Sequence, residues 1–231
     1  MIVWEIRLKV FFIRDVHVSM IYREIANYID GYLAQDAAFL EFHMKDKVKG
    51  YCFDRPFRAE KNDDVYKAGQ IYSFRIRTVD EGLLSYFMDG IADYKTDSIK
   101  GIVRTVCQIP RKPIASVCSL TPVILAMGDS YWRNHISFSE FEKELASSLL
   151  NQYLAYTGSQ FSCDFSLYDQ IELESRCPIG VKYKGITLLG DKISMRVSDN
   201  DNAQDVLYFA LANGMGTKGP RGCGFLGYRY V

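Results

Sequence analysis

Five glycines and two cations stand close together near the end of the chain, in Gly214-Met215-Gly216-Thr217-Lys218-Gly219-Pro220-Arg221-Gly222-Cys223-Gly224-Phe225, hereafter the glycine loop. An apolar run at 206–211 precedes the loop, and an aromatic run at 225–230 follows it. Glycine adopts positive φ and lets another backbone approach closely. A glycine-rich loop that also carries Lys218 and Arg221 predicts backbone amides turned toward an anion such as phosphate.

Two better-known glycine motifs do not fit this segment. Gly214-x-Gly216-x-x-Gly219 matches the dinucleotide-binding pattern, but that site needs a strand before its glycines and a helix after them. Here the predicted order is reversed, and only residues 225–231 follow the loop. A nucleotide-binding P-loop is excluded because no Gly-Lys-Ser/Thr is present. Residues 221–228 resemble the longer signature of the RNA recognition motif, with Cys223 in place of a stacking aromatic, which favours RNA in general.

The composition is that of a globular protein with one or two domains. The hydrophobic fraction is 48% and the charged fraction 24%, and both values are usual for such proteins. The formal net charge is +0. Total charge therefore does not indicate a tight nucleic-acid binder, although it is compatible with a local basic groove.

The sequence shows no sign of a membrane or secreted protein. No apolar run reaches the roughly 18 residues that a membrane helix needs, and the first residues alternate in polarity, unlike a signal peptide. We therefore expect a cytoplasmic protein without a membrane partner. The cysteines are scattered, with no Cys-x-x-Cys pair, which indicates reduced thiols and argues against a structural zinc site.

Polarity patterns divide the chain into two halves with the same order of elements. The first half predicts strand, helix, strand, strand, helix, strand at 3–12, 18–34, 51–57, 71–79, 83–91 and 102–109. The second half repeats this order at 115–127, 138–156, 165–173, 185–197, 201–212 and 225–230. A loop with three lysines follows the first helix. Ser137 or Ser139 can cap the helix at 138–156, and Ser139 with Glu142 matches a capping box.

This order defines the predicted fold. Each half has the βαββαβ order of a ferredoxin-like unit, and Pro110-Arg111-Lys112-Pro113 is the predicted linker because proline disfavours continuing either element. We predict an α+β chain of two tandem ferredoxin-like (RRM-like) domains. Residues 1–110 carry the candidate catalytic residues, and residues 114–231 carry the glycine loop.

Two such units, the second ending in Gly-h-Gly-x₅-Gly-h-Gly with h apolar, resemble the repeat-associated RNA-binding (RAMP) proteins of CRISPR systems. Within that superfamily the chain is most similar to the Cas six family, endoribonucleases that cut precursor CRISPR RNA within each repeat. The resemblance extends over nearly the whole chain, and the glycine loop is its most specific part. A second matching region places Tyr22 on the first helix, His43 after it, and Lys47 or Lys49 before the next strand.

The resemblance implies RNA cleavage without a metal or other cofactor. The ribose 2′-OH attacks the adjacent phosphate and leaves a 2′,3′-cyclic phosphate and a 5′-hydroxyl. The predicted catalytic residues are His43, Tyr22 and one of Lys47 and Lys49. Histidine can serve as acid or base at neutral pH, tyrosine would orient the 2′-OH, and a lysine ammonium suits charge developing on the phosphate.

The resemblance also names the partners. CRISPR repeat RNA is the expected ligand, and other subunits of a CRISPR effector complex or a second copy of the chain are further candidates. The glycine loop is predicted to contact RNA through Gly214, Gly216, Lys218, Gly219, Arg221, Gly222 and Gly224. Further candidate cations are Lys45, Arg55, Arg58, Arg104, Arg111, Lys112, Lys182, Lys184 and Arg229.

Each of these residues also has an ordinary structural interpretation. His43 fits a surface histidine on a basic loop, Tyr22 lies at core spacing with Ile25, and the glycine loop can simply join a helix to a strand. His17 could lie near the same cleft as His43. The chain can therefore also be a catalytically silent RNA-binding subunit of the same superfamily, or an unrelated ferredoxin-like protein that binds a small ligand or a partner.

Overall fold

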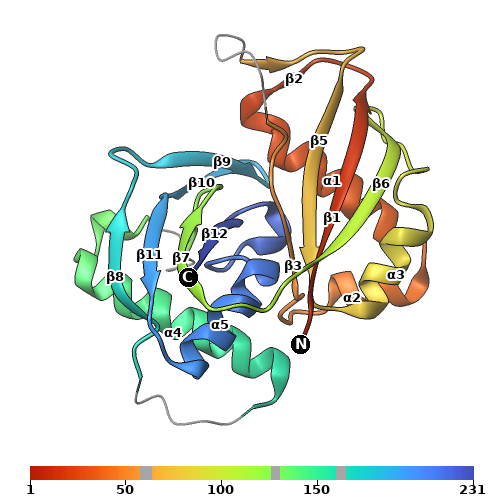
Figure 1. Ribbon diagram of the computed structural model, residues 1–231. Helices are drawn as coiled ribbons and strands as arrows, with labels where there is room; N and C mark the ends of the chain where they lie inside the picture. The colour runs from red at the N-terminus through yellow and green to blue at the C-terminus, as the bar shows by residue number, and fades with distance from the viewer. Residues whose placement is uncertain (58–63, 126–130, 160–164) are drawn as a thin grey trace.

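The computed structural model describes residues 1–57, 64–125, 131–159 and 165–231. They form an α+β chain with antiparallel sheets (Figure 1). The strands are β1 (Val3–Phe12), β2 (Val16–His17), β3 (Tyr51–Phe53), β4 (Val65–Tyr66), β5 (Ile71–Thr78), β6 (Ile99–Ile109), β7 (Ile114–Ser119), β8 (Tyr168–Leu173), β9 (Ile179–Tyr183), β10 (Ile186–Gly190), β11 (Ile193–Val197) and β12 (Leu226–Tyr230). The helices are α1 (Ile21–Leu33), α2 (Ala37–Met44), α3 (Glu81–Gly90), α4 (Phe138–Thr157) and α5 (Asp201–Asn213), with short 3₁₀ turns η1 (Val18–Met20), η2 (Trp132–Asn134) and η3 (Gly219–Arg221). Among the described helices, none is both long and apolar enough to cross a membrane.

The first sheet has the strand order β3-β5-β1-β6. Ile6, Leu8 and Val10 of the inner strand β1 are fully buried, as expected when alternate residues of a strand face the same side. Helices α1 and α3 contribute to the same core. Ile25 and Ile29 of α1 reach it together because residues four apart lie on one face of a helix.

The second sheet has the strand order β12-β7-β11-β8 and packs with α4 and α5 around a second core. Helix α4 buries Phe141, Leu145 and Leu149, which lie four residues apart and therefore share one face of the helix predicted at 138–156. Strands β2 and β4 form a separate two-stranded ladder, and β9 and β10 form a hairpin. The two four-stranded sheets have matching orders: β1 lies between β5 and β6, and β7 lies between β11 and β12. Figure 1 shows the two sheets side by side, each with its own helices.

The cap of α4 uses one of the two serines that the sequence offers. Ser137 accepts a hydrogen bond from the Glu140 amide, and the Glu140 carboxylate accepts one from the Ser137 amide. This reciprocal pair is a capping box. The alternative box of Ser139 with Glu142 is not used, because the helix has already begun at Phe138.

The second half departs from the predicted elements in two places. The strand predicted at 115–127 ends at Ser119, and residues 126–127 lie outside the described part of the chain. The strand predicted at 185–197 is two strands, β10 and β11, and β10 pairs with β9 in a hairpin. Lys184 and Gly185 turn this hairpin with φ of 45° and 84°, the positive values that a tight two-residue hairpin turn requires.

Arg77 on β5 joins the two halves of the molecule. Its side chain is almost fully buried, and its Nε donates to Glu5 Oε2 at 2.9 Å. Its Nη1 donates to the carbonyl oxygens of Leu226 at 2.6 Å and Leu211 at 3.4 Å. Since Leu211 precedes the glycine loop and Leu226 follows it, one guanidinium holds both ends of the loop against the first sheet. The Phe225 ring lies 4.2 Å from this guanidinium.

We predict that Arg77→Met lowers the free energy of unfolding by about 3–5 kcal/mol, because it removes the buried Arg77 donor from the Glu5 carboxylate and from two carbonyls. Urea denaturation measures the change. Arg7→Met is the matched control, since Arg7 also pairs with Glu5 but its side chain is 67% exposed. The control should cost less than about 1 kcal/mol, and equal costs for the two variants would contradict the assignment.

Candidate functional site

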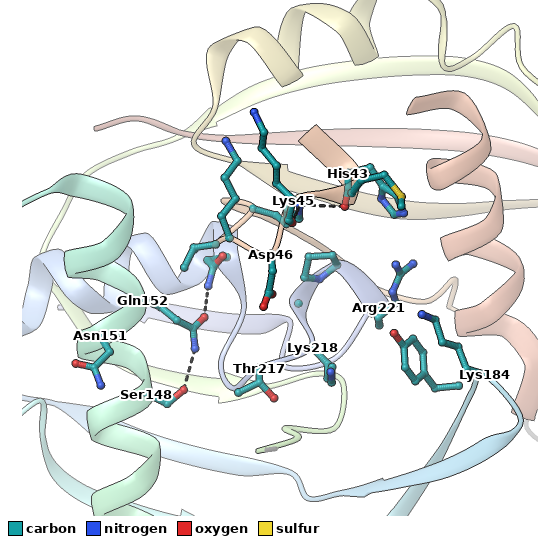
Figure 2. A pocket seen from close by; sticks show the side chains of 18 residues that line it. His43, Lys45, Asp46, Ser148, Asn151, Gln152, Lys184, Thr217, Lys218 and Arg221 are labelled. Carbon is teal, nitrogen blue, oxygen red and sulfur yellow. Dashed lines mark hydrogen bonds between the residues drawn. The ribbon is translucent and has the colours of Figure 1, made fainter. Parts of the chain in front are cut away.

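A cleft of about 780 Å³ opens between the two halves. The end of α2 and the loop after it form one wall, and α4, the β9–β10 hairpin and the glycine loop form the other (Figure 2). Its described lining residues are His43, Met44, Lys45, Asp46, Lys47, Val48, Lys49, Ser148, Asn151, Gln152, Tyr183, Lys184, Asn213, Thr217, Lys218, Gly219, Pro220 and Arg221. The structure thus brings three predicted catalytic residues and three residues of the glycine loop that were predicted to contact RNA into one cavity.

The cleft is strongly basic although the whole chain is neutral. Six lysines and arginines line it, and Asp46 is the one acid among the described lining residues. Three of the cations surround the half-buried Tyr183 ring. Lys184 Nζ and Lys218 Nζ each lie 5.5 Å from its centroid, and Arg221 Cζ lies 5.8 Å away. A polyanion with exposed bases would meet both charge and an aromatic face here.

His43 lies in the last turn of α2, a helix that the sequence analysis placed in a loop. Asp36 begins this helix by accepting hydrogen bonds from the amides of Ala38 and Phe39. The His43 side chain is 22% exposed, and its Nδ1 lies 3.4 Å from Asp30 Oδ1 on α1. The imidazole is therefore held at the cleft wall and can exchange a proton with a bound ligand.

The two candidate lysines have different surroundings. Lys49 Nζ donates to the carbonyl oxygens of Phe42, His43 and Lys45, so it caps the C-terminal end of α2. Burial and the neighbouring charge of Lys47 lower the pKa of Lys49. Lys47 is exposed, and its Nζ lies 5.0 Å from the centroid of the Phe42 ring. Lys47 is thus the more available cation, and Lys49 fixes the segment that carries His43.

The structure does not bring Tyr22 into the cleft. Tyr22 is only 6% exposed and belongs to the first core. It lies beneath the glycine loop, where a Cβ on Gly222 would come within 2.7 Å of its Cδ1. Burial raises the pKa of Tyr22 well above its ordinary value. This placement follows the core spacing of Tyr22 with Ile25, the interpretation that the sequence left open beside a catalytic one.

The amides of the glycine loop are largely paired inside the protein, contrary to the expectation of a free phosphate-binding surface. Most backbone amides of the loop donate to backbone carbonyls of the protein. The donor and acceptor pairs are Gly214 to Ala210, Met215 to Gly224, Thr217 to Ile124, Arg221 to Lys218, Gly222 to Gly219, Cys223 to Lys218 and Gly224 to Pro122. The amide of Phe225 donates to Thr121 Oγ1. These amides cannot also hold phosphate, so the loop reaches the cleft chiefly through the side chains of Lys218 and Arg221.

The glycines serve close packing instead. Gly214, Gly216, Gly222 and Gly224 have φ between 72° and 93°, where residues with a Cβ are strained. A Cβ on Gly219 would lie 2.0 Å from the Asn213 carbonyl oxygen, and one on Gly224 would lie 1.8 Å from that of Met215. Burial among these contacts raises the pKa of Cys223 to about 12, so this thiol stays neutral.

A chain of amide side chains fixes the floor of the cleft. Asn213 Nδ2 donates to Gln152 Oε1 at 2.5 Å, and Gln152 Nε2 donates to Ser148 Oγ at 2.8 Å (Figure 2). Gln152 Nε2 also donates to the Gly216 carbonyl at 3.0 Å. Asn213 Oδ1 accepts from the Gly50 amide at 3.2 Å. These contacts tie α4 and the glycine loop to the first half.

Some residues that line the cleft or contact its lining were missed by sequence reasoning. Asp30 lies on the polar side of α1, and the sequence around a single acidic residue on a helix does not indicate which distant side chains it contacts. Tyr183 was one of 16 tyrosines, and its hairpin was not predicted, although Lys184-Gly185 is a usable turn signal. Arg58 lies outside the described residues.

Comparison with solved structures identifies the class of fold. A protein described as "CRISPR associated protein Cas6" aligns with a TM-score of 0.72 at 16% identity, over 98% of this chain and 99% of its own. The product of a Cas6-related gene from Pyrococcus furiosus aligns with a TM-score of 0.70 at 16% identity, over 98% of each chain. "An RAMP protein binding different RNA substrates" aligns with a TM-score of 0.72 at 14% identity, over 98% of this chain and 99% of its own.

The chain therefore has the fold of Cas6 and RAMP proteins, and the resemblance seen in its sequence is confirmed at the level of fold. Comparison of the sequence with models of protein families gives no match, and comparison with curated proteins gives none either. Shared fold rather than sequence identity links the chain to these structures.

We predict that Gly224→Ala destabilises the protein far more than Gly158→Ala. Both glycines have positive φ, 72° and 69°, which costs a residue with a Cβ about 1–2 kcal/mol. A Cβ at Gly158 meets nothing within 4 Å, whereas one at Gly224 collides with the Met215 carbonyl and should cost about 1–3 kcal/mol more. Thermal unfolding measures both variants, and equal losses would contradict the packing role.

Proposed function

We propose that the protein is a metal-independent endoribonuclease that cleaves precursor CRISPR RNA within its repeat. The observation that carries this proposal is the position of His43 in a cleft where cations outnumber acids six to one among the described lining residues. Clustered lysine and arginine supply much of the affinity for a phosphodiester backbone. The fold shared with a Cas6 protein, and with a RAMP protein described as binding RNA substrates, supports the same ligand.

In the proposed reaction, the ribose 2′-oxygen bonds to the adjacent phosphorus while the bond from phosphorus to the 5′-oxygen breaks. The 2′-OH loses its proton and the 5′-oxygen gains one, so the products are a 2′,3′-cyclic phosphate and a 5′-hydroxyl. His43 performs one of these transfers, which typically contributes about 10²–10⁴-fold to the rate. A second group or water in the cleft performs the other.

The other predicted residues have different surroundings, and we propose different roles for them in RNA cleavage, RNA binding or support of the glycine loop. Lys47 is proposed to stabilise the charge of the transition state, because Lys49 is occupied by three carbonyl oxygens. Lys218 and Arg221 are proposed to hold the phosphate backbone from the opposite wall. Tyr22 is proposed to have a structural role, because its ring packs closely against the glycine loop at Gly222.

The two halves are proposed to be tandem ferredoxin-like domains, residues 1–110 and 114–231. The support is the matching strand order of the two four-stranded sheets. Each half has the order strand, helix, strand, strand, helix, strand once the two-stranded pairs β2/β4 and β9/β10 and helix α2 are left aside. The cleft lies between these halves, so RNA would contact both.

A catalytically silent RNA-binding subunit is the second candidate. The likeness to a RAMP protein described by its binding of RNA substrates favours it, as does the burial of Tyr22, which leaves one fewer catalytic group in the cleft. Such a protein would use the same basic surface and would keep its RNA uncut within an effector complex.

We predict that the protein cuts repeat RNA in the presence of EDTA and that His43→Ala lowers the cleavage rate about 10²–10⁴-fold with little change in RNA affinity. Gel analysis of labelled repeat RNA gives the rate, and filter binding gives the affinity. His17→Ala is the control, because His17 is exposed on β2 and is not one of the described residues that line the cleft. Binding without cleavage by the wild-type protein would favour the silent subunit.

The basic cleft also predicts the salt dependence of binding. Affinity falls as salt rises, and for a single strand each lost phosphate contact makes the plot of log affinity against log salt concentration less steep by about 0.7. Lys218→Ala should make this plot less steep by that amount. Lys100→Ala should leave its steepness unchanged, since Lys100 is exposed on β6 and is not among the described residues that line the cleft. The affinity of each variant for 2′-deoxy repeat RNA is measured over a series of salt concentrations. Equal slopes for the two variants would contradict the proposed contact between Lys218 and an RNA phosphate.

A further inference from the structure

Asp30 lies between the candidate catalytic histidine and the glycine loop. Its carboxylate belongs to α1, and its side chain is 24% exposed. Oδ2 accepts a short hydrogen bond from Nη1 of Arg221, on the opposite wall of the cleft. Oδ1 faces Nδ1 of His43 at 3.4 Å. One carboxylate thus contacts a residue from each wall.

Oδ1 of Asp30 needs a donor. It is buried and accepts no hydrogen bond within the described parts of the chain, and a buried acceptor without a partner is unfavourable. Nδ1 of His43 stands only slightly beyond hydrogen-bond distance from it. A proton on Nδ1 satisfies this oxygen, whereas a lone pair on Nδ1 would face a negatively charged acceptor.

We propose that Asp30 is a positioning residue that holds neutral His43 as the Nδ1–H tautomer and leaves Nε2 as the nitrogen that exchanges a proton with substrate. The inference rests on the proposed function for its catalytic consequence. When Nε2 takes a proton, the imidazolium carries one proton on each nitrogen, and the carboxylate beside Nδ1 stabilises that charge. The same contact serves His43 whether it acts as base or as acid.

Arg221 gives Asp30 a fixed orientation. The charge of Asp30 outweighs the effect of burial and raises the pKa of Arg221, so the guanidinium stays charged and keeps its hold on Oδ2. With Oδ2 held in this way, Oδ1 is directed toward the imidazole. Asp30 therefore also sets the spacing between His43 and the cations of the glycine loop.

Asp30→Asn is the sharpest test because it keeps the size of the side chain. The amide oxygen can still accept from Arg221, and the amide nitrogen then presents a donor to Nδ1, which forces the proton to Nε2. Glu41→Gln is the matched control, since Glu41 lies on the same helix as His43 but is exposed and pairs with Lys45. It removes the same charge without touching the imidazole or Arg221.

The first measurement is the tautomer, read by long-range ¹H–¹⁵N NMR at about pH 8.5, above the ordinary pKa of an imidazole. The chain has 3 histidines, and His43→Ala identifies the relevant signal. We expect the Nδ1–H form in the wild-type protein and in Glu41→Gln, and the Nε2–H form in Asp30→Asn. A wild-type signal of the Nε2–H form would overturn the inference without any variant being needed.

The second measurement is single-turnover cleavage at saturating repeat RNA, with affinity taken from an uncleavable 2′-deoxy RNA. Asp30→Asn should lower the cleavage rate about 10²–10⁴-fold and change the affinity less than about threefold, whereas Glu41→Gln should cut normally. An active wild-type protein with an equally active Asp30→Asn variant overturns the role of Asp30 alone. A wild-type protein that binds repeat RNA and never cuts it overturns the proposed function instead.

Discussion

The position of the glycine loop depends on one buried guanidinium. Arg77 donates to the carbonyl of Leu211 before the loop and to that of Leu226 after it, while Glu5 balances its charge. Moving the loop away from the first sheet would break the hydrogen bonds from Arg77 to both carbonyls, and a buried polar group that loses its partner is costly. This contact therefore fixes both ends of the glycine loop beside the first sheet.

The loop is a rigid support for cations rather than a surface of free amides. Its paired amides and closely packed glycines leave the backbone little freedom, so Lys218 and Arg221 project from a fixed base. Asp30 links this base to His43. The charges of Lys218 and Arg221 and the imidazole of His43 thus meet in one cleft although they come from opposite halves of the chain.

Long periodic elements such as α1 and α4 could be predicted from sequence because burial of one face dominates their pattern. The meeting of His43 with Lys218 and Arg221 could be expected only through the family resemblance, since it depends on contacts between distant segments. The short helix α2 and the β9–β10 hairpin were missed because their polarity patterns are weak. Whether the amides of the glycine loop are free depends on carbonyls elsewhere in the chain, which composition does not reveal.

The chemical identity of the RNA ends tests the account most directly. Repeat RNA incubated with the wild-type protein in EDTA would be analysed by mass spectrometry of both fragments. The account predicts a 2′,3′-cyclic phosphate on one fragment and a 5′-hydroxyl on the other, with no cut where the scissile ribose lacks its 2′-OH. A 3′-hydroxyl with a 5′-phosphate, or cleavage of the 2′-deoxy substrate, would contradict it.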